Sequence, residues 1–119
     1  VKQCLILAVL VAGLLALPVL GADREDWQEE VAHLLDYIAQ ANCSFIRNDK
    51  VYDSDQALDH INKKYEYVKN RISSAEQFIA YAASKSSITG KKYQVTCGET
   101  TLLSSEWLAE ELRAYRETR

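Results

Sequence analysis

Residues 43–56 read Cys-Ser-Phe-Ile-Arg-Asn-Asp-Lys-Val-Tyr-Asp-Ser-Asp-Gln, and this stretch decides the fold. Two short runs of strand-forming residues flank the Asn-Asp pair at 48–49, which tolerates tight-turn backbone conformations. We therefore expect a β-hairpin over residues 44–52. Asp53 is followed three residues later by Gln56, the spacing of a capping box, so a helix is predicted to begin directly after the hairpin.

Helical periodicity extends outward from this stretch. Apolar residues recur at helical spacing over residues 23–42, 53–72, 75–83 and 104–115. Ser73-Ser74-Ala75-Glu76 resembles a second capping box, which predicts a break before the third helix. We expect the last helix to follow directly on Leu102 and Leu103 and to be capped near Ser104 or Ser105. Acidic residues gather in the first turns of the first helix, where the helix dipole favours negative charge: Glu25, Asp26, Glu29 and Glu30.

The cysteines predict one disulfide. Of the three cysteines, Cys4 lies in the N-terminal segment that we expect to be a signal peptide, which leaves Cys43 and Cys97. Two cysteines in an exported chain are more often bridged than free. A pair of metal ligands is the alternative, but neither residue lies in a Cys-x-x-Cys motif and no HExxH motif accompanies them. We therefore expect a Cys43–Cys97 bridge and no metal.

A further strand over residues 93–97 is indicated by its alternating polarity. If Cys97 lies opposite Cys43 in an antiparallel pair, Phe45 faces Val95 and Arg47 faces Tyr93. The predicted fold class is therefore α+β, mainly α with a small antiparallel β-sheet: about four helices around one core, with one disulfide.

The N-terminal residues predict export. Residues 1–22 combine a basic start, an apolar run and small residues at the end, the pattern of a secretory signal peptide. A transmembrane anchor is the alternative, but the apolar run from Leu5 to Leu20 has 16 residues, short of the roughly 20 that span a bilayer. We expect cleavage near Ala22, a single globular domain over residues 23–119, and no stable membrane span in that domain.

Composition excludes several classes of protein. The 119 residues are 48% hydrophobic and include one proline and four glycines, so the chain is neither collagen-like nor largely disordered. Its formal charge of -3 argues against nucleic acid as a partner. Charge is nevertheless uneven, because residues 60–92 carry seven lysines and arginines against two glutamates. Such a segment can present a positive face to an anionic partner.

Several segments together resemble a known family. They are Phe45-Ile46-Arg47-Asn48, Arg71-Ile72, Ala75-Glu76-Gln77-Phe78-Ile79 and, most specifically, Ala83-Ser84-Lys85-Ser86-Ser87-Ile88-Thr89-Gly90-Lys91-Lys92-Tyr93. From about residue 27 to residue 116 the chain resembles the YfeK-like family of short exported bacterial proteins, a domain of unknown function. The resemblance implies a periplasmic location in Gram-negative bacteria, and it transfers no activity, substrate or catalytic residue.

The loop over residues 84–93 is the predicted working surface. It departs from a phosphate-binding loop, because Lys85 and Lys92 stand where that motif needs Gly and Ser or Thr. A looser anion-binding surface remains, with lysines for charge, hydroxyl groups for hydrogen bonds and a glycine for a tight turn. The candidate binding residues are His60, Lys85, Ser86, Ser87, Thr89, Gly90, Lys91, Lys92 and Tyr93. We expect a non-enzymatic periplasmic accessory or binding protein without a cofactor, whose partner is an envelope component or another periplasmic protein.

Two other readings stay open. A small envelope-acting hydrolase would use His60, oriented by Asp59, or a loop serine, and would need a pocket that joins His60 to residues 84–89. The non-catalytic alternative is that His33 lies on the surface in solvent and that His60 is hydrogen-bonded to backbone groups. Neither histidine would then take part in a reaction. Four tyrosines are not clearly assigned to the core by the helical pattern: Tyr52, Tyr67, Tyr81 and Tyr93. If two of them lie beside the 84–93 loop, a carbohydrate-binding surface is favoured.

Overall fold

The computed structural model describes Gly13 and residues 22–119, so the expected signal peptide lies almost wholly outside the described residues. The elements in chain order are α1 (Ala22–Gln40), β1 (Ser44–Arg47), β2 (Lys50–Tyr52), α2 (Ser54–Val68), the 3-10 turn η1 (Lys69–Arg71), α3 (Ala75–Ala82), β3 (Gln94–Cys97), β4 (Thr100–Leu103) and α4 (Ser104–Glu117). The predicted α+β class, with four helices, a small antiparallel sheet and one disulfide, is confirmed.

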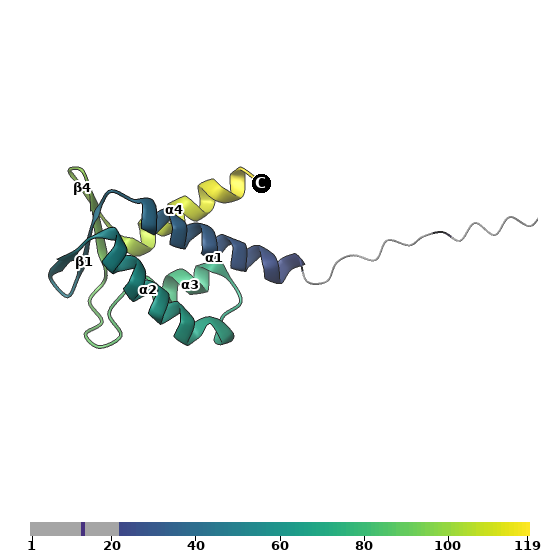
Figure 1. The fold of residues 1–119 in the computed structure, drawn as a ribbon, viewed down its shortest axis with the longest axis horizontal. Helices are drawn as coiled ribbons and strands as arrows, with labels where there is room; N and C mark the ends of the chain where they lie inside the picture. Colours follow the sequence, from purple (N-terminus) through teal and green to yellow (C-terminus); the bar gives the residue numbers. More distant parts are fainter. Residues whose placement is uncertain (1–12, 14–21) are drawn as a thin grey trace, which may run out of the picture.

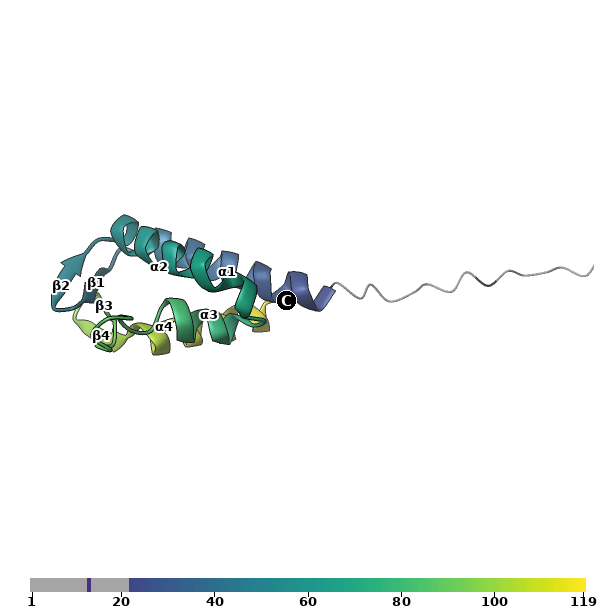
Figure 2. The same cartoon turned by 90° about the horizontal axis from the view of Figure 1, so that it is seen from below.

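The helices form two layers that the sheet closes at one end (Figure 1). Seen from below, α1 and α2 lie in one layer, α3 and α4 lie in the other, and the strands join the two (Figure 2). The sheet has the order β2-β1-β3-β4 with antiparallel pairing throughout. This topology brings the first hairpin against the second across a large gap in sequence.

The disulfide sets the register between the two hairpins as predicted. Cys43 and Cys97 are bridged with their Cα atoms 4.6 Å apart, and Phe45 pairs with Val95. The first hairpin turns at Asn48 and Asp49, whose φ angles of 51° and 66° are those that a two-residue type I′ turn requires.

The second hairpin was not predicted. Leu102 and Leu103 were expected to lead into the last helix, yet they belong to β4, which pairs with β3. Gly98 has a φ of 63° at the first position of the two-residue turn, where a type II′ turn favours glycine. Two apolar residues in a row, Leu102 and Leu103, show too little periodicity to distinguish a strand from the start of a helix. Hydrogen-bonded pairing with β3 makes this segment a strand.

One of the three predicted caps forms as predicted, since Asp53 and Gln56 make the capping box of α2. The break before α3 is confirmed, but the cap lies one residue later than the Ser73–Glu76 spacing predicts: Ser74 caps α3 and accepts from the N–H of Gln77. The expected cap of α4 by Ser104 or Ser105 is wrong, because Leu103 is the capping residue and makes no side-chain bond. The backbone N–H of Ser104 donates instead to the carbonyl of Tyr93 at 2.9 Å, so the sheet satisfies this helix end.

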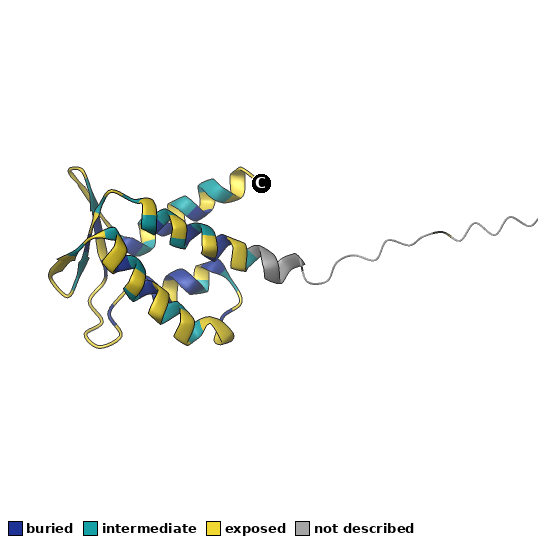
Figure 3. Cartoon of the chain, in the orientation of Figure 1, coloured by how far each residue is buried: buried dark blue, intermediate teal, exposed yellow. Residues whose placement is uncertain are grey.

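The core lies between the two helical layers and extends to the inner face of the sheet (Figure 3). Its largest fully buried side chains include Phe78, Leu34, Ile38 and Leu108. These residues lie on the apolar stripes that the periodicity marked, so the inward faces of the helices are those predicted. Among the described residues, no helix is both long enough and apolar enough to cross a membrane.

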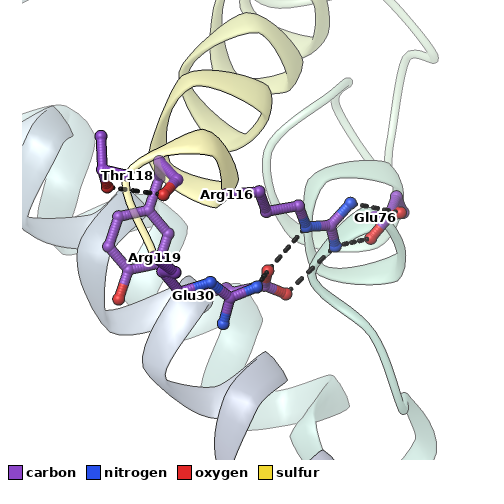
Figure 4. Close-up of polar contacts among 6 residues, drawn as sticks. Glu30, Glu76, Arg116, Thr118 and Arg119 are labelled. Atoms are coloured by element: carbon purple, nitrogen blue, oxygen red, sulfur yellow. Dashed lines mark hydrogen bonds and ion pairs between the residues drawn. The ribbon is translucent and has the colours of Figure 1, made fainter.

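An ion-pair network holds the far end of the helices together (Figure 4). The guanidinium of Arg116 on α4 binds both carboxylate oxygens of Glu30 on α1, at 2.6 and 3.1 Å, and also binds Glu76 on α3. Arg119 donates to Glu30 as well, at 2.7 Å. The Glu30 side chain is only 4% exposed. Glu30, which was predicted only to interact favourably with the helix dipole, therefore lies buried in an ion-pair network that joins α1, α3 and α4.

Candidate functional site

A cluster of polar side chains lies where β1, α2 and the 84–93 loop meet. Arg47 ends β1, His60 and Lys64 lie one helical turn apart on α2, and Tyr93 directly precedes β3. The antiparallel ladder between β1 and β3 has the predicted register and ends at the Ile46–Gln94 pair, so Arg47 and Tyr93 directly follow its last pair. In Figure 1 the start of α2 and the loop between α3 and β3 lie at the same end of the molecule as the sheet.

The hydroxyl group of Tyr93 is the centre of this cluster. It lies 2.9 Å from Nε2 of His60 and accepts a hydrogen bond from Nζ of Lys64 at 3.1 Å. The Lys64 ammonium also donates to the carbonyl of Lys85 at 2.7 Å and lies 5.0 Å from the centre of the Tyr93 ring. Tyr93 is itself buried. Lys64 is therefore held by three contacts, all of them with uncharged groups.

Arg47 completes the cluster from the sheet. Its Nη1 lies 2.9 Å from Nδ1 of His60, and its Nη2 donates to the Tyr52 hydroxyl at 3.2 Å, with the guanidinium over the Tyr52 ring. The same Nη1 lies 3.2 Å from Nε2 of His60, so it approaches both ring nitrogens. Because a guanidinium can only donate, neutral His60 accepts from Arg47 through a ring nitrogen. The expectation that backbone groups satisfy His60 is wrong, since side chains do so.

Burial and neighbouring cations act together on the titration of the site. Burial lowers the pKa of His60, and the positive charges of Arg47 and Lys64 lower it further. Burial and the charge of Arg47 lower the pKa of Lys64 in the same way, whereas burial raises the pKa of Tyr93. A carboxylate in contact would reverse the two cationic effects. In the part of the chain that the structure describes, no carboxylate contacts the cluster: Asp59 pairs with Lys63 at 3.0 Å, and its charge raises the pKa of His60 by less than burial, Arg47 and Lys64 each lower it.

The predicted loop is held by its own polar groups. Ser86 is buried, and its hydroxyl accepts hydrogen bonds from the N–H groups of Ile88 and Thr89. The backbone closes on itself as Gly90 donates to the carbonyl of Ser86 and Ser86 donates to that of Lys91. Gly90 has a φ of 74°, a conformation that other residues adopt with strain.

The loop is also tied to the first hairpin. Thr89 donates to the side-chain carbonyl of Asn48 at 2.6 Å, and the Lys91 ammonium pairs with Asp49 at 2.6 Å. The candidate residues therefore divide into two groups. Ser86, Thr89, Gly90 and Lys91 shape or attach the loop, whereas Lys85, Ser87 and Lys92 are exposed to solvent, and Tyr93 joins His60.

Arg47 and Lys64 are the site residues that the sequence analysis did not single out. Two signals could have found them. Lys64 lies four residues after His60, on the same face of α2, and the predicted register already placed Arg47 opposite Tyr93. Tyr52 was named only as a tyrosine not clearly assigned to the core; the hairpin register pairs Arg47 with Lys50 and so places Tyr52 diagonally across from Arg47 on the same face.

Two hollows adjoin His60. A narrow cavity of about 30 Å³ lies between the sheet and α2, lined by apolar groups and by Arg47, His60 and Tyr93. An open hollow of about 410 Å³ lies on the other side, between α2, α3 and the loop. It is lined by His60, Lys63, Lys64, Tyr67, Val68, Tyr81 and Ser87. A concave surface thus joins His60 to the loop.

The other histidine is part of the helical framework. His33 was expected to lie in solvent, but its Nε2 is 2.6 Å from a carboxylate oxygen of Glu111 and its ring stacks on Tyr115 at 4.0 Å between centroids. These contacts link α1 to α4. The periodicity of a single helix cannot predict which residues of another helix lie beside its polar face. In the part of the chain that the structure describes, no group of three or more His, Cys, Asp or Glu side chains could hold a metal ion.

Fold and site together define a small disulfide-bonded α+β protein with a half-buried cationic cluster beside an open hollow. Residues 25–116 match the family of unknown function DUF5329, and the chain belongs to that family. The resemblance to YfeK-like proteins is confirmed: the chain is 37% identical over 89 residues to the uncharacterized protein YfeK of Salmonella typhimurium strain LT2, covering 74% of each chain. Comparison with solved structures gave no significant match.

Proposed function

We propose that this protein is a non-enzymatic periplasmic binding protein that holds an anionic component of the cell envelope at the Arg47–His60–Lys64–Tyr93 cluster. The 84–93 loop forms one wall of the site. Export rests on the signal-peptide pattern of residues 1–22. The Cys43–Cys97 disulfide is consistent with an oxidising compartment such as the periplasm.

The observation that carries the proposal is the lack of an acidic partner for Arg47 and Lys64. Within the described residues, every contact of these two side chains is with a histidine, a tyrosine or a carbonyl group. Several exposed cations do pair with acids, as Lys69 does with Glu66 and Arg113 with Glu110, whereas Arg47 and Lys64 are partly buried. Partly buried cations without a counter-charge favour an anion at the site, and the low local dielectric strengthens that attraction.

The loop contributes position more than charge. Its hydroxyl groups hold the turn and attach it to the hairpin, so that the carbonyl of Lys85 and the hydroxyl of Tyr93 reach Lys64. Lys85 and Lys92 are exposed beside the site and add positive potential around it. Lys91 adds less, because Asp49 neutralises it.

Retention on an immobilised envelope fraction from Gram-negative cells tests the proposal. We expect retention to fall with rising salt and to be lost in the Arg47→Gln/Lys64→Gln variant. The matched control is Lys69→Gln/Arg113→Gln, which removes the same charge from residues that acids already neutralise. Equal loss in both variants would show attraction by net charge alone, and no retention of the unaltered protein would refute the function.

A small hydrolase remains the second candidate, because the open hollow brings Ser87 and His60 to one surface. The hydrogen bonds favour binding instead. Both ring nitrogens of His60 are engaged by Arg47 and Tyr93, and Asp59 is engaged by Lys63. A general base needs a free ring nitrogen within reach of the hydroxyl that it activates. A serine-directed fluorophosphonate that labels Ser87 in a His60-dependent manner would establish the hydrolase.

A further inference from the structure

We infer that the anion held at this site is the acidic group of a sugar, and that the open hollow between α2, α3 and the loop receives the sugar ring. This inference rests on the proposed function, since Lys64 and His60 belong both to the cationic cluster and to the wall of the hollow. It adds the chemical class of the ligand, an acidic glycan.

Two exposed tyrosines carry the inference. Tyr67 on α2 is 78% exposed and Tyr81 on α3 is 60% exposed, although both rings line the same hollow. Two exposed rings in one concavity offer an apolar surface to a ligand, because an aromatic side chain buries a large area when it meets a partner. The guanidinium of Arg71 lies 5.0 Å from the centre of the Tyr67 ring and steadies it. A sugar ring has an apolar C–H face that packs on aromatic rings, and hydroxyl groups that remain available for hydrogen bonds.

The remaining wall of the hollow suits the polar edge of such a ring. Lys63 and Lys64 can donate to hydroxyl and acidic groups, and Ser87 can both donate and accept. Among the described residues, no acidic side chain lines the hollow, so an anionic substituent meets only positive or neutral groups there. A volume of about 410 Å³ also falls within the range of about 300–1,000 Å³ that is typical of small-molecule sites.

An acidic sugar fits this hollow better than a lipid surface does. A bilayer is met by protruding apolar side chains, whereas Tyr67 and Tyr81 line a concavity. The two tyrosines come from different helices that pack together, so their separation is fixed by the fold. A preformed concave site of this kind recognises a discrete molecule.

Titration by ¹H–¹⁵N NMR with galacturonate, galactose and acetate separates the contributions of ring and charge. We expect galacturonate to bind about ten-fold more tightly than either of the others. Tyr81→Ala should weaken galacturonate binding by a similar factor and leave acetate binding unchanged, while Tyr81→Phe, the matched control, retains it. Lys64→Gln should weaken both carboxylates.

The outcomes distinguish the inference from the proposed function. If acetate and galacturonate bind equally, with the same dependence on Lys64, the site binds anions but not sugars, and only the inference fails. If neither carboxylate shifts the site resonances and the protein is not retained on the immobilised envelope fraction, the proposed function fails too. Binding to phosphatidylglycerol vesicles that exceeds galacturonate binding and survives Tyr81→Ala would replace the sugar by a lipid headgroup.

Discussion

Arg116→Met should destabilise the protein far more than an equivalent change one turn earlier on the same helix. Arg116 supplies two of the three hydrogen bonds received by the Glu30 carboxylate, whose side chain is 4% exposed. Without Arg116, the negative charge of Glu30 stays buried and keeps its hydrogen bond from Arg119. Methionine keeps the helix propensity and much of the side-chain volume, so the change isolates the charge.

The magnitude follows from the degree of burial. Removing one partner from a fully buried ion pair costs about 3–5 kcal/mol. Arg116 is 39% exposed and Arg119 keeps one contact with Glu30, so we expect a loss of about 2 kcal/mol in the free energy of unfolding. For a domain of this size that corresponds to a fall of about 10 °C in Tm.

Thermal and urea unfolding followed by circular dichroism at the helical band measure this loss. The control is Arg113→Met, which breaks two exposed contacts with Glu110 and Glu117 on the same helix and should leave the transition unchanged. Glu30→Met together with Arg116→Met should recover part of the loss, because no buried charge is then left unpaired. Equal effects of Arg116→Met and Arg113→Met would refute the reasoning.

Three further predictions concern the disulfide, the site and the loop. The Cys43→Ser/Cys97→Ser variant opens a link with a sequence separation of 54, and we expect a loss of about 4 kcal/mol in urea unfolding. His60 has a lowered pKa in the folded state, so the unfolded state binds the proton more tightly; stability should be full above about pH 6.5 and fall as the pH drops below it, and His60→Gln should remove this slope. Ser86→Ala should cost about 1 kcal/mol and speed amide exchange at Ile88 and Thr89.

Each of these has a clear contrary result. Unfolding of the cysteine variant at the same urea concentration as the oxidised protein would contradict the role of the bridge. An unchanged pH profile in His60→Gln would place the titration on another group. Exchange that stays slow at both amides in Ser86→Ala would show that the loop backbone holds without that hydroxyl.

Local signals in the sequence predicted the parts of the fold that depend on neighbouring residues. The Asn48-Asp49 turn and the Asp53–Gln56 capping box are interactions within four residues, and both occur. The cap of α3 falls at Ser74, one residue after the predicted Ser73. The strand β4 was missed because Leu102 and Leu103 fit a strand or a helix start equally well. Only the pairing of Thr100–Leu103 with β3 settles that choice.

The candidate site was predicted only in part, because its contacts join segments that are remote in sequence. His60 and Tyr93 were named from residue type, and they meet at the Tyr93 hydroxyl. Lys85 was named for its charge, but only its backbone carbonyl reaches the cluster, where it accepts from Lys64. Arg47 was placed opposite Tyr93 by register, but its role as a cation of the site depends on the absence of a nearby acid. A sequence shows which acids exist and not which of them a given cation reaches.

The sequence by itself determined the fold class, the disulfide and the register of β1 on β3, because periodicity, capping and the two cysteines act through the backbone or through a covalent bond. The tertiary structure decided which charged side chains contact one another. It buries Glu30 among three helices and places His33 against Glu111, and among the described residues it brings no carboxylate into contact with Arg47 or Lys64. Pairing of charges depends on distances of a few ångströms between segments remote in sequence, and only the packed chain sets those distances.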